Sequence, residues 1–189
     1  MAISWKKTNL PTLAEKKLAA VNEACREAIY AGIDVELSGG TEHFSLDIHE
    51  QTNIESMFTA VTLGAKEQQY SSDGGASKTY SAADIVLLYA AYKSFVTRHT
   101  AYCNLLKAWI RRETDTAVIA GITYGAELPA DLKTQLQSAV DAAAAQLQRI
   151  TELVSAGAFA DKITSLEAQM TDTQIALCDV YELALGGEL

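Results

Sequence analysis

Apolar and polar residues alternate along the chain with two different periods. Apolar positions recur every three or four residues, the period of a helix that buries one face, over residues 12–31, 47–64 and 81–120. Residues 33–37 and 43–48 instead alternate singly around Ser38-Gly39-Gly40, as two half-buried strands joined by a tight turn do. The pattern predicts a mainly α protein: a small helical domain with one β-hairpin at about residues 33–48, followed by long helices forming a bundle or coiled coil.

The predicted helix ends carry capping residues. Thr12 and Glu15 have the spacing of a capping box, in which each side chain accepts a backbone N–H of the other residue. Gly32 follows the first helix and allows the left-handed conformation that ends it. Ser81 precedes the long helix, with Asp84 at its third position, where the helix dipole favours an acid.

The predicted helix over residues 81–120 has two apolar stripes rather than one. The first comprises Ile85, Leu88, Tyr92, Phe95, His99, Tyr102, Leu106 and Trp109, and the second comprises Tyr89, Val96, Cys103 and Ile110. A helix that is apolar over so much of its circumference is packed on two sides, so we expect it to be the central helix. The helical spacing of its aromatic residues favours packing over the stacking of nucleic-acid bases, which usually occurs on sheets with basic flanks.

A narrower apolar seam follows in the last third of the chain. Its members recur mostly at spacings of three and four residues, and they are Leu136, Val140, Leu147, Ile150 and Val154, then, beyond Gly157, Ile163, Leu166, Met170, Leu177 and Val180. This spacing is typical of a coiled coil or a long helical hairpin. We therefore expect these residues to form an interface that is buried between subunits of a homo-oligomer.

The same patterns divide the chain into three parts. Residues 1–11 form an N-terminal arm, residues 12–120 the helical domain with its hairpin, and residues 121–189 a helical hairpin or coiled-coil arm. Trp5 stands in the short basic N-terminal arm with no periodic pattern around it. Because large aromatic side chains often anchor interfaces, Trp5 is a candidate interface residue.

Composition and charge exclude several classes of protein. The chain has 189 residues, of which 49% are hydrophobic, and this content is too high for a mainly disordered protein. The net charge is −9, and the acidic last third would repel phosphates, so we expect no nucleic-acid partner. An apolar run of about 18 residues would be needed to span a membrane, and the sequence has none. The first residues do not resemble a secretory signal, so we expect synthesis in the cytoplasm.

Motifs that carry chemistry are missing from the sequence. Cys25, Cys103 and Cys178 lie far apart, which argues against a disulfide framework and a zinc site and favours small buried hydrophobic side chains. Neither Ser38-Gly39-Gly40 nor Asp73-Gly74-Gly75 has the lysine of a phosphate-binding loop. We therefore expect no catalytic residue, no cofactor and no metal.

The sequence has three histidines, a residue type used in acid–base catalysis and metal binding. On a strand over residues 43–48, His43, Ser45 and Asp47 would share one face, but members of a catalytic triad converge from different elements. His43 and His49 are therefore expected on a solvated face of the hairpin. His99 lies in the apolar stripe of the central helix and is expected in the core or an interface, with a ring nitrogen bonded to a neighbouring polar group.

Several segments of this sequence resemble an uncharacterised domain of bacteriophage and prophage tail-associated proteins, including tail-fibre and tail-fibre-assembly proteins. These segments are Phe44-Ser45-Leu46-Asp47, Gln51-Thr52-Asn53-Ile54, Ser81-Ala82-Ala83-Asp84-Ile85, His99, and Leu106-Lys107-Ala108-Trp109-Ile110, and they span about residues 44–120. The stretch Leu177–Leu183 also looks like the closing helix of small phage baseplate and tail proteins. The resemblance brings no catalytic residues with it.

The resemblance implies a structural component of a phage tail, baseplate or tail-fibre apparatus that acts by helical oligomerisation and attachment to other tail or baseplate proteins. The implied location is the virion tail, and a trimer is expected by analogy with tail-fibre symmetry. Two alternatives stay open at this point: a tail-fibre assembly chaperone that leaves before the virion matures, and a small cell-surface hydrolase.

Overall fold

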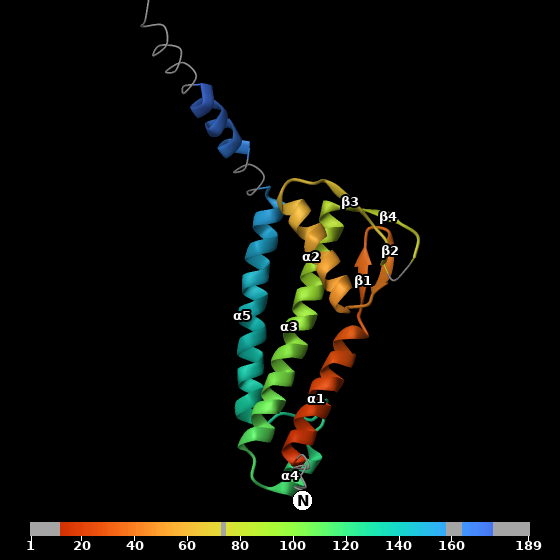
Figure 1. Cartoon of the computed structure of the whole chain (residues 1–189), viewed down its shortest axis with the longest axis vertical. Coiled ribbons are helices and arrows are strands. Elements are labelled where there is room, and N and C mark those ends of the chain that lie inside the picture. The colour runs from red at the N-terminus through yellow and green to blue at the C-terminus, as the bar shows by residue number, and fades with distance from the viewer. Residues whose placement is uncertain (1–11, 73–74, 158–163, 176–189) are drawn as a thin grey trace, which may run out of the picture.

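A long central helix organises the fold. The computed structural model describes residues 12–72, 75–157 and 164–175. The helices are α1 (Leu13–Tyr30), α2 (Ile48–Thr62), α3 (Ala82–Arg112), α4 (Thr116–Gly121) and α5 (Ala130–Ser155). Helix α3 packs on α1, α2 and α5, and Figure 1 shows these helices side by side along its length. The structure confirms the mainly α fold with long helices, and it confirms α3 as the central helix.

The predicted helix ends are present. The Thr12 side chain accepts the N–H of Glu15, whose carboxylate accepts the N–H of Thr12 at 2.7 Å, so the capping box is complete. Asp47 caps α2 by accepting the N–H of Glu50 at 2.8 Å. Gly32, with φ of +80°, follows α1 and turns the chain into the first strand. These local interactions fix where the helices start and stop.

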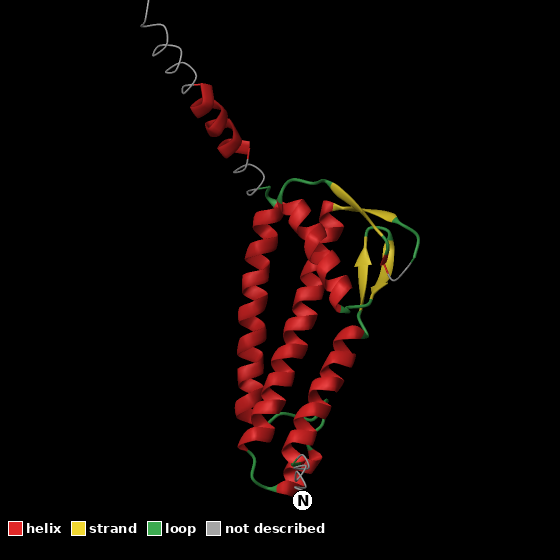
Figure 2. Cartoon of the chain, in the orientation of Figure 1, coloured by secondary structure: helices red, strands yellow, loops and turns green. Residues whose placement is uncertain are grey.

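Two antiparallel hairpins lie at the same end of the helices (Figure 2). The first pairs β1 (Ile33–Leu37) with β2 (Gly40–Phe44), so the predicted hairpin is confirmed, although its second strand starts and ends earlier than expected. The second pairs β3 (Glu67–Tyr70) with β4 (Lys78–Ser81) and was not predicted. Glu67-Gln68-Gln69-Tyr70 lacks the alternation of apolar and polar residues by which strands are recognised.

A buried carboxylate joins the first hairpin to the central helix. Asp84, in the first turn of α3, accepts the N–H of Ser38 at 2.8 Å and the hydroxyl of Ser38 at 2.7 Å. The hydroxyl of Ser81 donates to the same carboxylate at 2.8 Å. Burial alone would raise the pKa of Asp84, but these hydrogen bonds outweigh it and hold the pKa below its ordinary value. The turn of the hairpin is thereby held against α3.

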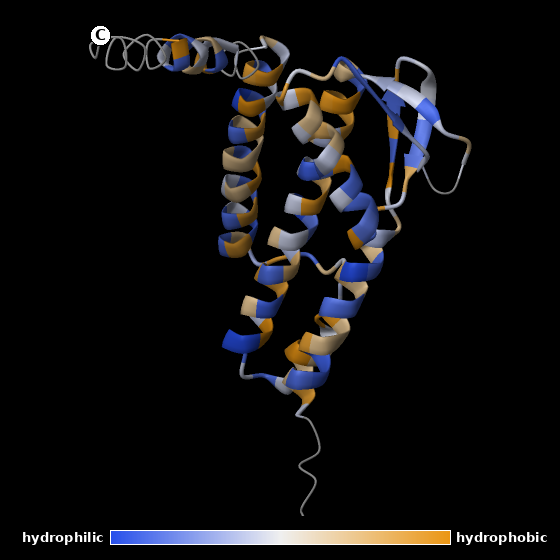
Figure 3. Cartoon of the chain, turned by 45° about the horizontal axis from the view of Figure 1, so that its top comes forward, coloured by the Kyte–Doolittle hydropathy of each residue, from blue (hydrophilic) through white to orange (hydrophobic). Residues whose placement is uncertain are grey.

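The core has two parts stacked along α3. The upper part lies under the hairpins and includes the fully buried Phe44, Leu46, Ile54, Ile85 and Leu88. The lower part lies between α1, α3 and α4 and includes Val21, Leu106, Ile110 and Ile122. Figure 3 shows hydrophobic and hydrophilic residues alternating along each helix, as in helices that bury one face.

The apolar seam of α5 faces α3 of the same chain. Val154 belongs to the upper core and Leu136 packs on the lower one, while Ile150 is half-buried against the upper core. Val140 and Leu147 lie beside Lys93, Ser94 and Thr97 of α3. Val154 is buried there, whereas Leu136, Val140, Leu147 and Ile150 are only half-buried. Helix α5 thus packs on α3 of its own chain, and an interface between subunits along this stripe stays a prediction.

The central helix ends earlier than the predicted residue 120. Its last residue is Arg112, and a short connection leads to α4. The Glu113 carboxylate accepts the N–H groups of Thr114 and Asp115 at 2.9 and 3.1 Å. Asp115 in turn caps α4 by accepting the N–H of Ala117 at 2.8 Å. Two acidic side chains therefore accept backbone N–H groups at this break. These bonds compete with the hydrogen bonds of a continuous helix, and the spacing of apolar residues does not reveal them.

Residues 164–175 form a further helical segment, here called the distal segment, in which every residue is exposed. Two seam residues lie in it: Leu166 is 50% exposed and Met170 is 64% exposed. The other predicted interface residues of the two chain ends, Trp5, Ile163, Leu177 and Val180, lie outside the described residues.

Candidate functional site

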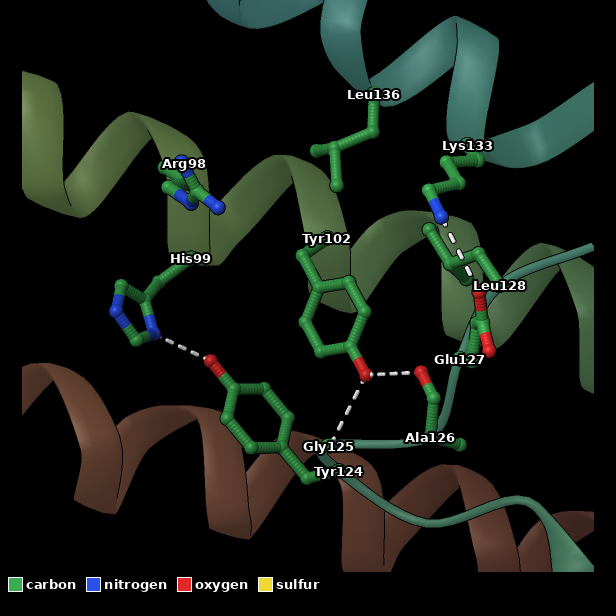
Figure 4. Close-up of a pocket in the computed structure, with 10 residues that line it drawn as sticks. All are labelled: Arg98, His99, Tyr102, Tyr124, Gly125, Ala126, Glu127, Leu128, Lys133 and Leu136. Atoms are coloured by element: carbon green, nitrogen blue, oxygen red, sulfur yellow. Dashed lines mark hydrogen bonds and ion pairs between the residues drawn. The ribbon is translucent and has the colours of Figure 1, made fainter. Parts of the chain in front are cut away.

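A pocket of about 380 Å³ opens beside the lower half of α3 (Figure 4). Its walls come from α3, from the first turns of α5 and from the connection between α4 and α5. The lining residues are Arg98, His99, Tyr102, Tyr124, Gly125, Ala126, Glu127, Leu128, Lys133 and Leu136. A pocket of this size with mixed apolar and polar walls is in the range that holds small ligands.

The connection between α4 and α5 is fixed to α3 by a tyrosine. The hydroxyl of Tyr102 donates to the carbonyl oxygen of Ala126 at 2.6 Å and accepts the N–H of Gly125 at 3.0 Å. The ring of Tyr102 also contacts that of Tyr124 edge to face, with centroids 5.3 Å apart. The backbone of this wall is therefore held in one position by the fold itself.

His99 bonds across the pocket to Tyr124, with 2.5 Å between Nδ1 and the phenol oxygen. The ring of Phe95 also contacts that of His99, with 4.2 Å between the ring centroids. Burial lowers the pKa of His99, and the positive charge of Arg98 lowers it further. Burial raises the pKa of Tyr124, so its hydroxyl stays protonated. The prediction that His99 is an interior histidine with a polar partner is confirmed.

Charged groups stand at both ends of the pocket. Figure 4 shows Arg98 beside His99 at one end and Lys133 beside Glu127 at the other. The Lys133 ammonium pairs with the Glu127 carboxylate at 3.1 Å. Within the described residues, no carboxylate pairs with the guanidinium of Arg98, which is exposed. The Arg98 end therefore carries a cation that is free to meet an anion.

Two cysteines lie behind the pocket, between α1 and α3. The Cys25 thiol donates to the carbonyl oxygen of His99 at 3.6 Å, and the Cys103 thiol to that of Val21 at 3.9 Å. Burial, reinforced by the neighbouring Cys103, raises the pKa of Cys25 to about 11. A thiol that remains protonated at neutral pH is a poor nucleophile and metal ligand. Both behave as the small buried side chains that were predicted, and Cys178 lies outside the described residues.

The polar residues around the first hairpin have partners on different elements. His43 lies opposite Asp34 on the neighbouring strand, and its Nδ1 is 2.7 Å from the Asp34 carboxylate. Asp47 instead caps α2, and His49 is exposed in the first turn of that helix. Among the described residues, no cluster of three or more His, Cys, Asp or Glu side chains could hold a metal ion.

A second candidate site is the surface of the distal segment. Leu166, Met170 and Thr173 lie along one side of this helix and are here called the distal face; Gln169 and Gln174 flank them. Their spacings of four and three residues continue the apolar seam that the sequence shows before and after this segment. The distal face is exposed, whereas the equivalent face of α5 is covered by α3.

The spacing of apolar residues in the sequence predicts the distal face but not the pocket. The helical spacing predicts only a packing role for Tyr102, and the sequence around Arg98 and Tyr124 carries no motif. The pocket depends on the return of the chain after α4, which brings Tyr124 to a histidine 25 residues away in the sequence. Only the glycines around Tyr124, which interrupt the helical pattern, signal an ordered connection there.

Comparison with known proteins places the chain in a family. No curated protein and no solved structure matches it. In the described residues, no helix combines the length and apolarity needed to cross a membrane. A protein-family profile matches residues 12–126, which run from the cap of α1 to the wall of the pocket. Since this is more than half of the sequence, the chain belongs to the family described as "Domain of unknown function (DUF4376)".

Proposed function

We propose that this protein is a non-enzymatic structural component of a bacteriophage tail, baseplate or tail-fibre apparatus. It works by attachment: the distal segment associates with copies of itself, and the assembly binds other tail or baseplate proteins. The observation that carries the proposal is the exposed distal face, on which Leu166 and Met170 are 50% and 64% exposed. The proposal places the protein in the virion tail after synthesis in the host cytoplasm.

Single exposed apolar residues are common on protein surfaces and need no partner. The distal face differs because Leu166 and Met170 are four residues apart on one side of a helix and belong to a longer seam in the sequence. A second helix of the same kind would cover this seam by inserting side chains between its ridges. Two copies of the distal segment carry the same spacing of apolar residues. This shared spacing favours self-association over binding to an unrelated partner.

The assignment to a phage tail rests on the resemblance of residues 44–120 to tail-associated proteins. The family profile covers this stretch and extends beyond it on both sides. The helical body, meaning α1 to α5 with both hairpins, gives such a component a rigid part of defined shape. A trimer is the proposed state, by analogy with the symmetry of tail fibres.

Sedimentation of the full chain tests the self-association. The unmodified protein is expected to sediment as a trimer of 20.3 kDa chains. The double change Leu166→Asp and Met170→Asp places two charges on the distal face and is expected to weaken association about tenfold or more, because burying an unpaired charge is costly. Sedimentation equilibrium over a range of concentrations measures this shift in mass.

A matched control places the same charges on the opposite side of the same helix. Thr171 and Ile175 are also four residues apart, and Ile175 lies about two and a half helical turns beyond Leu166. Thr171→Asp with Ile175→Asp should leave the mass unchanged. An unmodified protein that stays monomeric at every concentration, or two double variants that behave alike, would contradict the proposed role of the distal face.

A further inference from the structure

The pocket beside α3 combines an unpaired cation with apolar walls. The guanidinium of Arg98 stands at one end, and no described carboxylate pairs with it. Tyr102 and Leu136 line the space between Arg98 and the Lys133–Glu127 pair, as Figure 4 shows. Arginine binds carboxylates through two parallel hydrogen bonds. The aromatic and aliphatic walls would cover a flat apolar group attached to that carboxylate.

We propose that this pocket binds a small organic carboxylate, with the carboxylate on Arg98 and the apolar body between Tyr102 and Leu136. Its volume of about 380 Å³ admits a ligand with a single aromatic ring or a short branched chain. The walls are held in place by the bonds of Tyr102 to Gly125 and Ala126, so the site needs little reorganisation to accept a ligand. This binding site does not depend on the proposed role in a phage tail.

The charges around the pocket discriminate against other ligands. The Lys133–Glu127 pair is neutral overall and leaves Arg98 as the uncompensated charge. The other groups that face His99 carry no charge at neutral pH: Tyr124 from the α4–α5 connection and Cys25 from α1. A cationic ligand would meet Arg98 without a compensating acid at that end. A neutral ligand of the same shape would make no ion pair with the guanidinium.

His99 provides a built-in reporter of an anion at Arg98. Burial and the charge of Arg98 hold the pKa of His99 below its ordinary value. A carboxylate bound to Arg98 would offset that positive charge and favour the imidazolium form. Binding should therefore raise the pKa of His99, and a surface-bound anion elsewhere should not.

The test uses nuclear magnetic resonance of the full chain with benzoate as the probe. Benzamide has the same shape without the charge, and acetate has the charge without the ring. Benzoate at millimolar concentration is expected to shift the amide signals of Tyr102, Tyr124 and Leu136 and to raise the pKa of His99. Benzamide and acetate should each bind at least about tenfold more weakly.

Two variants and a control complete the experiment. Arg98→Gln should weaken benzoate binding about tenfold and abolish its effect on the pKa of His99. Leu136→Trp should fill the pocket and block benzoate while leaving Arg98 in place. Arg111→Gln removes an exposed arginine of α3 outside the pocket and should change nothing. No benzoate-dependent shift in the unmodified chain, equal binding by acetate, or benzoate binding that survives Arg98→Gln would overturn the proposal.

Discussion

Gly32→Ala is expected to lower the free energy of unfolding by about 3 kcal/mol. Gly32 has φ of +80°, a conformation that an alanine adopts only with strain. A Cβ atom there would also lie 2.2 Å from the carbonyl oxygen of Phe44 and 2.8 Å from the Cα atom of Ser45. Both neighbours are backbone atoms, so no side-chain rotation relieves the clash. Urea denaturation followed by circular dichroism measures the loss.

The control for this change is Gly39, in the turn of the first hairpin, which Gly32 precedes. Nothing lies within 4 Å of a Cβ atom built on Gly39, and its backbone is outside the left-handed region. Gly39→Ala should therefore alter stability by less than about 0.5 kcal/mol. If both variants unfold at the same urea concentration, this would contradict the close approach of Gly32 to the backbone of Phe44 and Ser45.

The double change Leu147→Asp with Ile150→Asp is expected to lower the free energy of unfolding by about 3 kcal/mol, because both side chains face α3 within the chain. The change would remove two half-buried aliphatic side chains from the packing of α5 on α3 and would place the Ile150 carboxylate against the upper core. The same denaturation measurement gives the loss, and sedimentation of the folded fraction gives the mass. The mass should stay that of the unmodified protein.

This pair of readouts separates the two interpretations of the seam on α5. Ala145→Asp with Leu153→Asp introduces the same charges on exposed positions of the same helix and should have little effect on stability. Normal stability of the Leu147 and Ile150 double variant together with a reduced mass would mean that the seam is buried between subunits. That outcome would contradict the packing of α5 on α3.

The features that the sequence predicted correctly are those determined by neighbouring residues. The capping box of Thr12 and Glu15, the stop at Gly32 and the cap at Ser81 each involve residues within four positions of each other. Such interactions are the same whatever lies around the helix. The first hairpin was recognisable for a similar reason, since its strands alternate and are joined by a two-residue turn.

The features that were missed depend on distant residues. The second hairpin brings Tyr80 to Glu42, with 2.8 Å between the phenol and carboxylate oxygens, and neither strand shows this partner in its own sequence. An apolar seam with spacings of three and four residues can pack on a helix of the same chain or of another chain. The sequence therefore does not show which helix α5 packs on. The pocket requires Arg98, Tyr102 and Leu136 from two helices that only the folded chain brings together.

The composition of the virion itself is the most direct test of a structural role in a phage tail. Particles released from cells that express this chain from its native locus would be purified and their proteins quantified by mass spectrometry. The proposal predicts that the chain is present in a constant ratio to the other tail proteins, at a multiple set by the symmetry of the tail. Absence of the chain from purified particles would contradict it, and is the result expected of an assembly factor that leaves before maturation.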